Sequence, residues 1–237
     1  MNMNLLQVNW VRGDEVVVPD NQNLFVFYGD NSSVLPFHWP DYLTDKEMQT
    51  MGGHASSSVG KIRGMARAFL RYYCALYLQK PPLELIFHTT ESGKPYLPGC
   101  GLHFNVSHTD FSFLIAFATK QPVGIDLERP FPSPDLPDVM AYAFSAAEIE
   151  FVQSGDDTTS RFYTIWTAKE AYLKATGSGL VDHLPEVDLL ASGEAQSAIS
   201  RFRFHSFFSP GGEIGCLVSG RSDTEICFYH LSAASAF

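Results

Sequence analysis

The sequence has few cysteines, and none of its cysteine or histidine spacings suits a zinc site. Cys74, Cys100, Cys216 and Cys227 stand far apart, and the 8 histidines include no HExxH pair. We therefore expect buried free thiols. Any metal site must be built from carboxylates, the ligands that hard cations such as Mg²⁺ prefer.

Long hydrophobic runs are also absent. No stretch approaches the ~20 apolar residues of a membrane span, and the first residues lack the basic start and apolar run of a signal peptide. We expect a soluble cytoplasmic protein that does not contact membranes. Hydrophobic residues still make up 45% of the 237 residues, which is enough to bury the core of one large domain or two small ones.

Basic residues are scarce compared with acidic ones. The chain has 16 Lys and Arg against 26 Asp and Glu, a formal net charge of −10, which disfavours binding to nucleic acid. Four of these 16 basic residues, Lys61, Arg63, Arg67 and Arg71, nevertheless lie in one short window. The window predicts a local basic patch on an acidic protein.

The first half reads as helix followed by strands. Serines at 56–58 offer helix caps and Pro81-Pro82 forbid continuation, so we expect a helix over 57–79. Apolar or alternating runs separated by Gly, Pro and Asp predict a mostly antiparallel sheet from strands at 83–88, 102–108, 111–119 and 122–128. The Pro-rich segment 129–137 is the best linker candidate.

The second half repeats this order about one hundred residues later. Thr44-x-x-Glu47 and Ser145-x-x-Glu148 both have the form of a capping box, and a second helix is expected over 158–176. Strand-like runs follow at 184–189, 214–220 and 223–229. We expect an α+β fold and a pseudo-dimer of similar halves, 1–128 and 129–237, each with a long helix on a sheet, and a site in the cleft between them.

Two carboxylates stand out on the strand at 122–128. Asp126 and Glu128 are two residues apart, so they project from the same face and could clamp Mg²⁺, although a solvent-exposed polar strand face explains them as well. On the second helix, Glu170 lies at the edge of the expected buried face and Lys174 is its i,i+4 neighbour. Trp166 on the same helix is expected in the core.

Two further polar groups follow strand-like runs. Ser107 and His108 end the strand at 102–108 and could hold a phosphate, although a lone His at a strand end is more often structural. Lys94 lies in the turn-like run Glu91-Ser92-Gly93-Lys94-Pro95, where a solvated side chain is expected.

Taken together, these motifs resemble the surfactin-synthetase-activating type of 4′-phosphopantetheinyl transferase in order and spacing. The resemblance is close over residues 58–179 and rests on five motifs, namely Gly93-Lys94-Pro95, Phe104 to His108, Gly124 to Glu128, Phe144 to Glu148, and Trp166 to Lys174. It implies that the 4′-phosphopantetheine arm of coenzyme A is moved to a serine of an apo acyl, polyketide or peptidyl carrier protein. The product released would be 3′,5′-ADP, and a monomer is expected.

The resemblance also implies roles for single residues. Asp126, Glu128 and Glu170 would hold Mg²⁺, with Mn²⁺ possible, and Glu170 is the first choice of general base. Phosphate contacts would come from Lys94, Ser107, His108 and Lys174, and the 3′-phosphate would be bound by Lys61, Arg63 or Arg67. His108 and Lys174 would also assist catalysis.

Glu148 matches an acidic residue beside the family's active site, so it is an alternative base. Its place in a complete capping box explains it at least as well. Two other interpretations of the whole chain stay open at this point. One is a carboxylate-metal phosphohydrolase, which the acidic charge disfavours if the substrate is nucleic acid. The other is a protein that binds coenzyme A without turnover.

Overall fold

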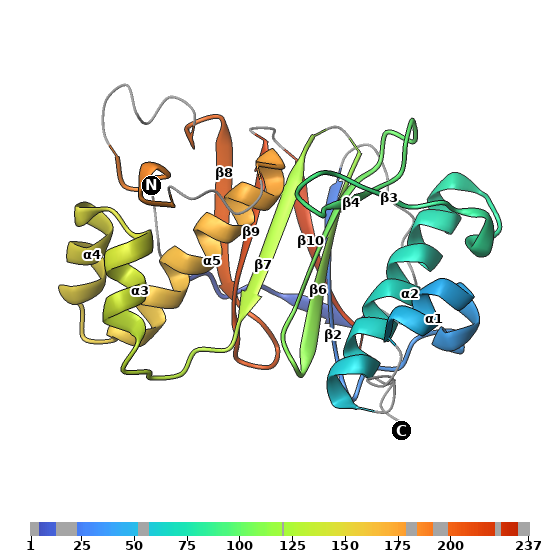
Figure 1. The fold of residues 1–237 in the computed structure, drawn as a ribbon, viewed down its shortest axis with the longest axis horizontal. Coiled ribbons are helices and arrows are strands. Elements are labelled where there is room, and N and C mark those ends of the chain that lie inside the picture. Colours follow the sequence, from blue (N-terminus) through green and yellow to red (C-terminus); the bar gives the residue numbers. More distant parts are fainter. Residues whose placement is uncertain are drawn as a thin grey trace.

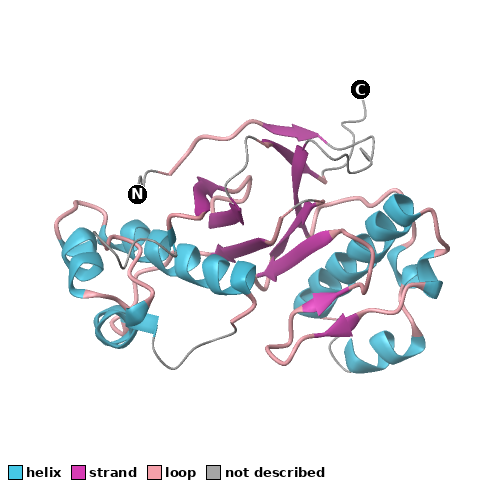
Figure 2. Cartoon of the chain, turned by 90° about the horizontal axis from the view of Figure 1, so that it is seen from above, coloured by secondary structure: helices cyan, strands magenta, loops and turns pink. Residues whose placement is uncertain are grey.

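Two β-sheets pack face to face, and each carries one long helix on its outer surface (Figures 1 and 2). The structure is a computed structural model that describes residues 5–12, 23–51, 57–119, 121–178, 184–191, 199–220 and 224–231. The α+β composition expected from the sequence is confirmed. No helix in these described ranges is long and apolar enough to cross a membrane.

The elements follow one another in helix-then-strand order twice along the chain. The strands are β1 (Trp10–Arg12), β2 (Asn23–Asp30), β3 (His88–Thr89), β4 (Pro95–Tyr96), β5 (His103–His108), β6 (Ser112–Ala118), β7 (Val123–Glu128), β8 (Phe202–Phe208), β9 (Ile214–Gly220) and β10 (Glu225–His230). The α-helices are α1 (Asp45–Met51), α2 (Ser58–Leu78), α3 (Leu136–Ala143), α4 (Ala146–Gln153) and α5 (Thr158–Thr176). Short 3₁₀ helices are η1 (Trp39–Tyr42), η3 (Pro82–Glu84) and η4 (Leu184–Glu186).

The helix α2 covers the five-stranded sheet, whose order is β1-β10-β2-β6-β5. Ser57 caps its first turn by accepting from the Gly60 amide, and the helix ends at Gln79 in the left-handed conformation. Its buried face places Tyr73 against Phe27 and Phe117, with ring centroids 4.8 and 4.2 Å apart. Burial of such aromatic rings fixes α2 on this sheet.

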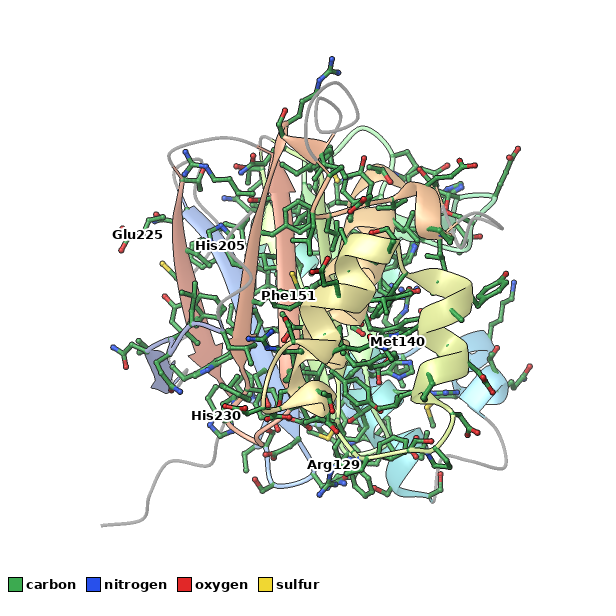
Figure 3. The ribbon with its side chains drawn as sticks, turned by 90° about the vertical axis from the view of Figure 1, so that its left-hand side faces the viewer. Arg129, Met140, Phe151, His205, Glu225 and His230 are labelled. Atoms are coloured by element: carbon green, nitrogen blue, oxygen red, sulfur yellow. The ribbon has the colours of Figure 1, made fainter. Side chains whose placement is uncertain are left out.

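The helix α5 covers the three-stranded antiparallel sheet, whose order is β7-β9-β8. It begins after the Asp157 cap and ends at Gly177, as the sequence predicts. Gly124 of β7 permits a close approach, because a Cβ at this position would lie 2.0 Å from the Ala171 carbonyl oxygen of α5. The helices α3 and α4 pack beyond α5, where Met140 and Phe151 mark them in Figure 3.

A third apolar core fills the space between the two sheets. It contains twelve buried side chains from both sheets, Leu24, Val26, Tyr28, Leu114, Ala116, Ala118, Val123, Ile125, Leu127, Phe207, Leu217 and Phe228. The molecule therefore has four layers, α2, sheet, sheet and α5, and β7 lies where the two sheets meet.

Most strand pairs are antiparallel, as expected. The exceptions are the parallel pairs that β10 makes with β1 and β2. The three strands expected at 102–108, 111–119 and 122–128 are present as β5, β6 and β7, and those expected at 214–220 and 223–229 are present as β9 and β10.

Two expected strands are wrong. Residues 83–88 begin in η3 and reach β-structure only at His88, and residues 184–189 begin in η4. In both segments a buried cation from a long helix takes the backbone carbonyls that a neighbouring strand would otherwise need. Arg71 donates to the carbonyls of Pro82 and Leu85, and Lys169 donates to the carbonyl of Leu184.

Candidate functional site

Three carboxylates from two elements line one cavity of about 380 Å³. Asp126 and Glu128 come from β7, and Glu170 comes from α5, which Gly124 allows to lie directly on this strand. The alternation of β7 places both of its carboxylates on the same face, as predicted. The other polar residues lining the cavity are Ser107, His108, Trp166 and Lys174.

The carboxylates of this cavity, which we call the acidic pocket, are only partly satisfied. Asp126 is 4% exposed, and its Oδ1 accepts from Lys174 Nζ at 2.6 Å and from Ser107 Oγ at 2.9 Å. Asp126 Oδ2 and Glu170 Oε1 are buried and have no hydrogen-bond partner among the residues that the structure describes. Unsatisfied buried oxygens are costly, so this arrangement favours a ligand that can supply positive charge.

Burial and crowding raise the pKa values of Glu128 and Glu170. Burial, followed by the nearby Asp126 charge, raises the pKa of Glu128 to about 7. The same two causes raise the pKa of Glu170. Neighbouring carboxylates repel one another, which favours the protonated form of some of them. A divalent cation bound between them would favour the ionised form of all of them.

The donor set therefore fits a hard cation such as Mg²⁺, although the described residues do not form a finished site. Among them, no group of three or more His, Cys, Asp or Glu side chains already has the arrangement of a metal centre. Instead, the Lys174 ammonium supplies the positive charge beside Asp126. The oxygens without a partner, Asp126 Oδ2 and Glu170 Oε1, would have to move toward an ion when it binds.

Basic groups stand beside the acidic pocket. Lys94 Nζ donates to the carbonyls of Val123 at 3.0 Å and Lys174 at 2.5 Å, and burial followed by the Lys174 charge lowers the pKa of Lys94 to about 8. Lys94 is therefore not a freely solvated turn residue, as the sequence suggested. His108 lines the pocket, and burial followed by the Arg63 charge lowers its pKa.

A second cavity of about 500 Å³ adjoins the first. It lies between α2, the β3–β4 hairpin and β5, and it shares Val106 and His108 with the acidic pocket. Of the basic residues predicted on α2, Arg63 and Arg67 line this cavity. Lys61 is not among its lining residues, because its ammonium donates to the Asn31 carbonyl at 3.0 Å.

Glu148 lies outside this group of residues. Its carboxylate is 0% exposed and is not among those lining the acidic pocket. Both oxygens are occupied, since Oε2 accepts from the Ser145 amide and contacts Lys169 Nζ at 2.7 Å, while Oε1 accepts from the Leu189 amide at 2.9 Å. The structure therefore places Glu148 in a capping box and a buried ion pair.

Sequence reasoning missed two residues of the site. Trp166 was expected in the core, and it does stack on Phe162 at 6.2 Å, but it also lines the acidic pocket together with Glu128. Its i,i+4 spacing from Glu170 was a usable signal. Asn105 was not singled out, and its Oδ1 accepts from the Ile125 amide at 2.8 Å, which joins β5 to β7 beside the pocket.

Comparison with known proteins agrees with this geometry. Residues 122–213, which include β7 and α5, match the 4′-phosphopantetheinyl transferase superfamily. The 4′-phosphopantetheinyl transferase HetI of Nostoc is 36% identical over 129 residues, 52% of this chain and 54% of HetI. The 4′-phosphopantetheinyl transferase Sfp of Bacillus subtilis is 32% identical over 126 residues, 52% of this chain and 55% of Sfp.

A vertebrate protein also matches. The L-aminoadipate-semialdehyde dehydrogenase-phosphopantetheinyl transferase of Xenopus laevis is 29% identical over 166 residues, 62% of this chain and 53% of that protein. The chain thus spans about half the length of the curated relatives it matches.

Proposed function

The chain is a homologue of the 4′-phosphopantetheinyl transferases, and from this premise we propose that it transfers the 4′-phosphopantetheine arm of coenzyme A to a serine of an apo carrier protein. One observation carries the proposal. The matched segment contains the three carboxylates and the Lys174 ammonium of the acidic pocket, which are brought together from β7 and α5. Clustered carboxylates that can hold a metal ion, with a lysine beside them, suit the transfer of a phosphate-containing group.

In this proposal Asp126, Glu128 and Glu170 hold Mg²⁺. The unpartnered oxygens of Asp126 and Glu170 support the assignment. A bound divalent ion would neutralise the pyrophosphate and stabilise the charge of the leaving phosphate. Trp166 lines the pocket beside these carboxylates.

The chain's own residues would divide the remaining work. Lys174, Ser107 and His108 bind phosphate oxygens, and Lys94 holds the backbone of β7 and α5 together beneath them. The serine oxygen forms a bond to the phosphorus that carries the pantetheine arm, the bond to the departing phosphate breaks, and 3′,5′-ADP leaves. Glu170 accepts the serine proton, because it lines the pocket and its buried Oε1 has no hydrogen-bond partner among the described residues.

The two-half organisation belongs to the same proposal. We propose that 1–128 and 129–237 are structurally related halves that meet at the site. Equivalent elements support this, because capping boxes open α1 and α4. An ion pair also joins each capping glutamate to the following long helix, Glu47 to Arg71 and Glu148 to Lys169. The strands β7 and β10 follow equivalent hairpins, and each pairs within the sheet of the other half.

The direct test is incubation with coenzyme A, Mg²⁺ and an apo carrier protein, followed by mass spectrometry of the carrier. The expected result is a mass gain equal to one phosphopantetheine group. A phosphohydrolase would release phosphate and leave the carrier mass unchanged, and a coenzyme A-binding protein would do neither. We propose that the enzyme acts as a cytoplasmic monomer, and a panel of fatty-acid, polyketide and peptide carriers would identify its partner.

A further inference from the structure

The strands β5 and β7 lie at facing edges of the two sheets. β7 is the outer strand of the order β7-β9-β8, and β5 is the outer strand of the order β1-β10-β2-β6-β5. β7 lies where the two sheets meet (Figure 1), and β5 packs against it. Among the residues that the structure describes, the two strands nevertheless belong to separate sheets and share no ladder. Each edge therefore presents backbone groups that need other partners.

Two side chains from β5 and from the loop before β4 supply partners for the edge of β7. Lys94 Nζ donates to the Val123 carbonyl at 3.0 Å, and Asn105 Oδ1 accepts from the Ile125 amide at 2.8 Å. Val123 and Ile125 are alternate residues of β7, so their backbone groups lie along the same edge. The Asn105 side chain thus takes the place of a neighbouring strand at the residue directly before Asp126.

Asn105 does not line the acidic pocket itself. It is 4% exposed and lines a smaller cavity of about 260 Å³, which shares Glu170 and Lys174 with the acidic pocket. Any effect of Asn105 on the reaction must therefore pass through the residues that it holds in place. A neutral amide suits this position, because an aspartate would accept the same hydrogen bond but would add a fourth carboxylate beside the other three.

The Asn105 hydrogen bond holds one strand of site residues against the other. Two residues further along β5, Ser107 Oγ donates to Asp126 Oδ1 at 2.9 Å. This second contact depends on the first, because Ile125 is the residue next to Asp126 and its amide fixes the backbone of β7 beside β5. The same Asp126 oxygen accepts from Lys174 Nζ at 2.6 Å. A shift of β7 away from β5 would therefore disturb both partners of Asp126.

We infer that Asn105 is a positioning residue that places Asp126 for cation binding by holding the Ile125 amide. The inference rests on the proposed function, in which Asp126 is a ligand of Mg²⁺. It goes beyond that proposal, because it assigns a role in cation binding to a residue outside the acidic pocket. The atom that Asn105 positions is the buried Asp126 Oδ2, which has no hydrogen-bond partner among the described residues.

The first test measures amide hydrogen exchange of the full-length protein by NMR. In wild type the Ile125 amide should be protected although it lies at a sheet edge, and an unprotected Ile125 amide overturns the inference whatever the variants do. Asn105→Leu and Asn105→Ser both remove the acceptor, so this amide should exchange about 10-fold faster or more. The Ile115 amide, in the middle of the sheet on β6, should stay unchanged. Asn105→Asp keeps an acceptor oxygen and should restore the protection.

The second test measures Mg²⁺ affinity from melting temperatures at increasing Mg²⁺ concentration, which needs no turnover. The dissociation constant should rise about 10-fold in Asn105→Leu and Asn105→Ser, because both lose a group that orients a metal ligand, and Asn105→Asp should recover most of the affinity. His103→Leu is the control, since His103 is an exposed residue of the same strand. Unchanged Mg²⁺ affinity in variants with faster Ile125 exchange would mean a purely structural role and would overturn the inference.

Carrier modification separates this inference from the proposed function. In Asn105→Leu and Asn105→Ser, the Mg²⁺ concentration that gives half-maximal turnover should rise while the carrier KM stays the same. A wild type that modifies carriers but shows no Mg²⁺ response, or shows the same response in every variant, overturns the inference and leaves the proposed function standing. If the exchange and affinity effects are found but wild type modifies no carrier, the proposed function fails and the positioning role of Asn105 stands.

Discussion

Lys169 and Glu170 are neighbours in the sequence, but they lie on different sides of α5 and differ in how well their polar atoms are paired. On the side that faces α4, Lys169 is 1% exposed, and its ammonium contacts Glu148 and the carbonyls of Ala143 and Leu184. On the side that faces β7, Glu170 has a buried oxygen without a partner among the described residues. Adjacent residues of one motif thus have different environments, since Lys169 forms a satisfied ion pair and Glu170 keeps an unsatisfied oxygen that a ligand could use.

The first half contains a counterpart of the Glu148 side. Glu47 caps α1 as Glu148 caps α4, and each pairs with a buried cation on the following long helix. The difference is that Glu47 also lines a cavity, whereas Glu148 is completely buried. The same arrangement therefore borders a cavity in one half and only the core in the other.

The sharpest test of this comparison is Glu170→Gln. Removal of one carboxylate from a crowded cluster relieves repulsion, so we expect an unchanged or higher melting temperature. Carrier modification should nevertheless fall by about 10²–10³-fold, because both cation binding and proton acceptance are lost. Initial rates at saturating coenzyme A and Mg²⁺, together with thermal melts, measure the two effects.

Glu91→Gln is the matched control, because Glu91 is an exposed carboxylate in the loop before Lys94. It should leave both quantities unchanged. Near-normal turnover in Glu170→Gln would show that Glu170 is not needed for the reaction. The charged residues on both sides of α5 would then have structural roles only.

The next prediction concerns Glu148→Gln. Loss of this carboxylate leaves the buried Lys169 ammonium without its ion-pair partner. We therefore expect the free energy of unfolding, measured in urea titrations, to fall by about 3–5 kcal/mol. Protein that remains folded at low temperature should keep its kcat, since Glu148 does not line the acidic pocket. Glu150→Gln, on the exposed face of the same helix, is the control. A stable but inactive Glu148→Gln protein would instead support a catalytic role for Glu148.

Local signals in the sequence were enough to predict the helices and most strands. Serine caps before α2, the left-handed Gly177 after α5, and the alternation that places Asp126 and Glu128 together all depend on residues close in the chain. These features are short-range, so they can be recognised without knowledge of the fold.

Long-range side-chain contacts account for the errors. The segments after Pro82 and Leu184 look like strands until Arg71 and Lys169 are seen to take their carbonyls. The ion pair between Glu148 and Lys169 could not be predicted either, because the two residues are 21 positions apart in the sequence. In the same way, the engagement of Arg67 by Glu47 depends on how α1 packs on α2.

A smaller effect is expected from Mg²⁺ on stability. An ion that binds only the folded protein stabilises it by about 2.7 kcal/mol at 100 times its dissociation constant. Mg²⁺ should therefore raise the melting temperature of wild type without any substrate, whereas NaCl at equal ionic strength should not. Glu170→Gln should respond weakly and Glu148→Gln normally, relative to its own lower baseline. Equal responses in both variants would mean that Mg²⁺ does not use the β7 side of α5.

The smallest effect concerns Glu47 and pH. Burial alone would raise the pKa of Glu47, but the Thr44 amide and the charges of Arg67 and Arg71 outweigh it and lower the pKa from 4.5 to about 2. A carboxyl whose pKa is depressed on folding stabilises the protein above the unfolded value of 4.5, and this contribution is lost as pH falls toward 2. Because the pair is partly open to solvent, we expect a contribution of about 1 kcal/mol. The difference in unfolding free energy between wild type and Glu47→Gln should therefore be full at pH 6 and shrink between pH 4.5 and pH 3, while the corresponding difference for Glu150→Gln stays near zero. A Glu47→Gln difference that does not change over this range would show that the glutamate stabilises α1 only as a neutral cap, and the ion pair would then not be the counterpart of Glu148 and Lys169.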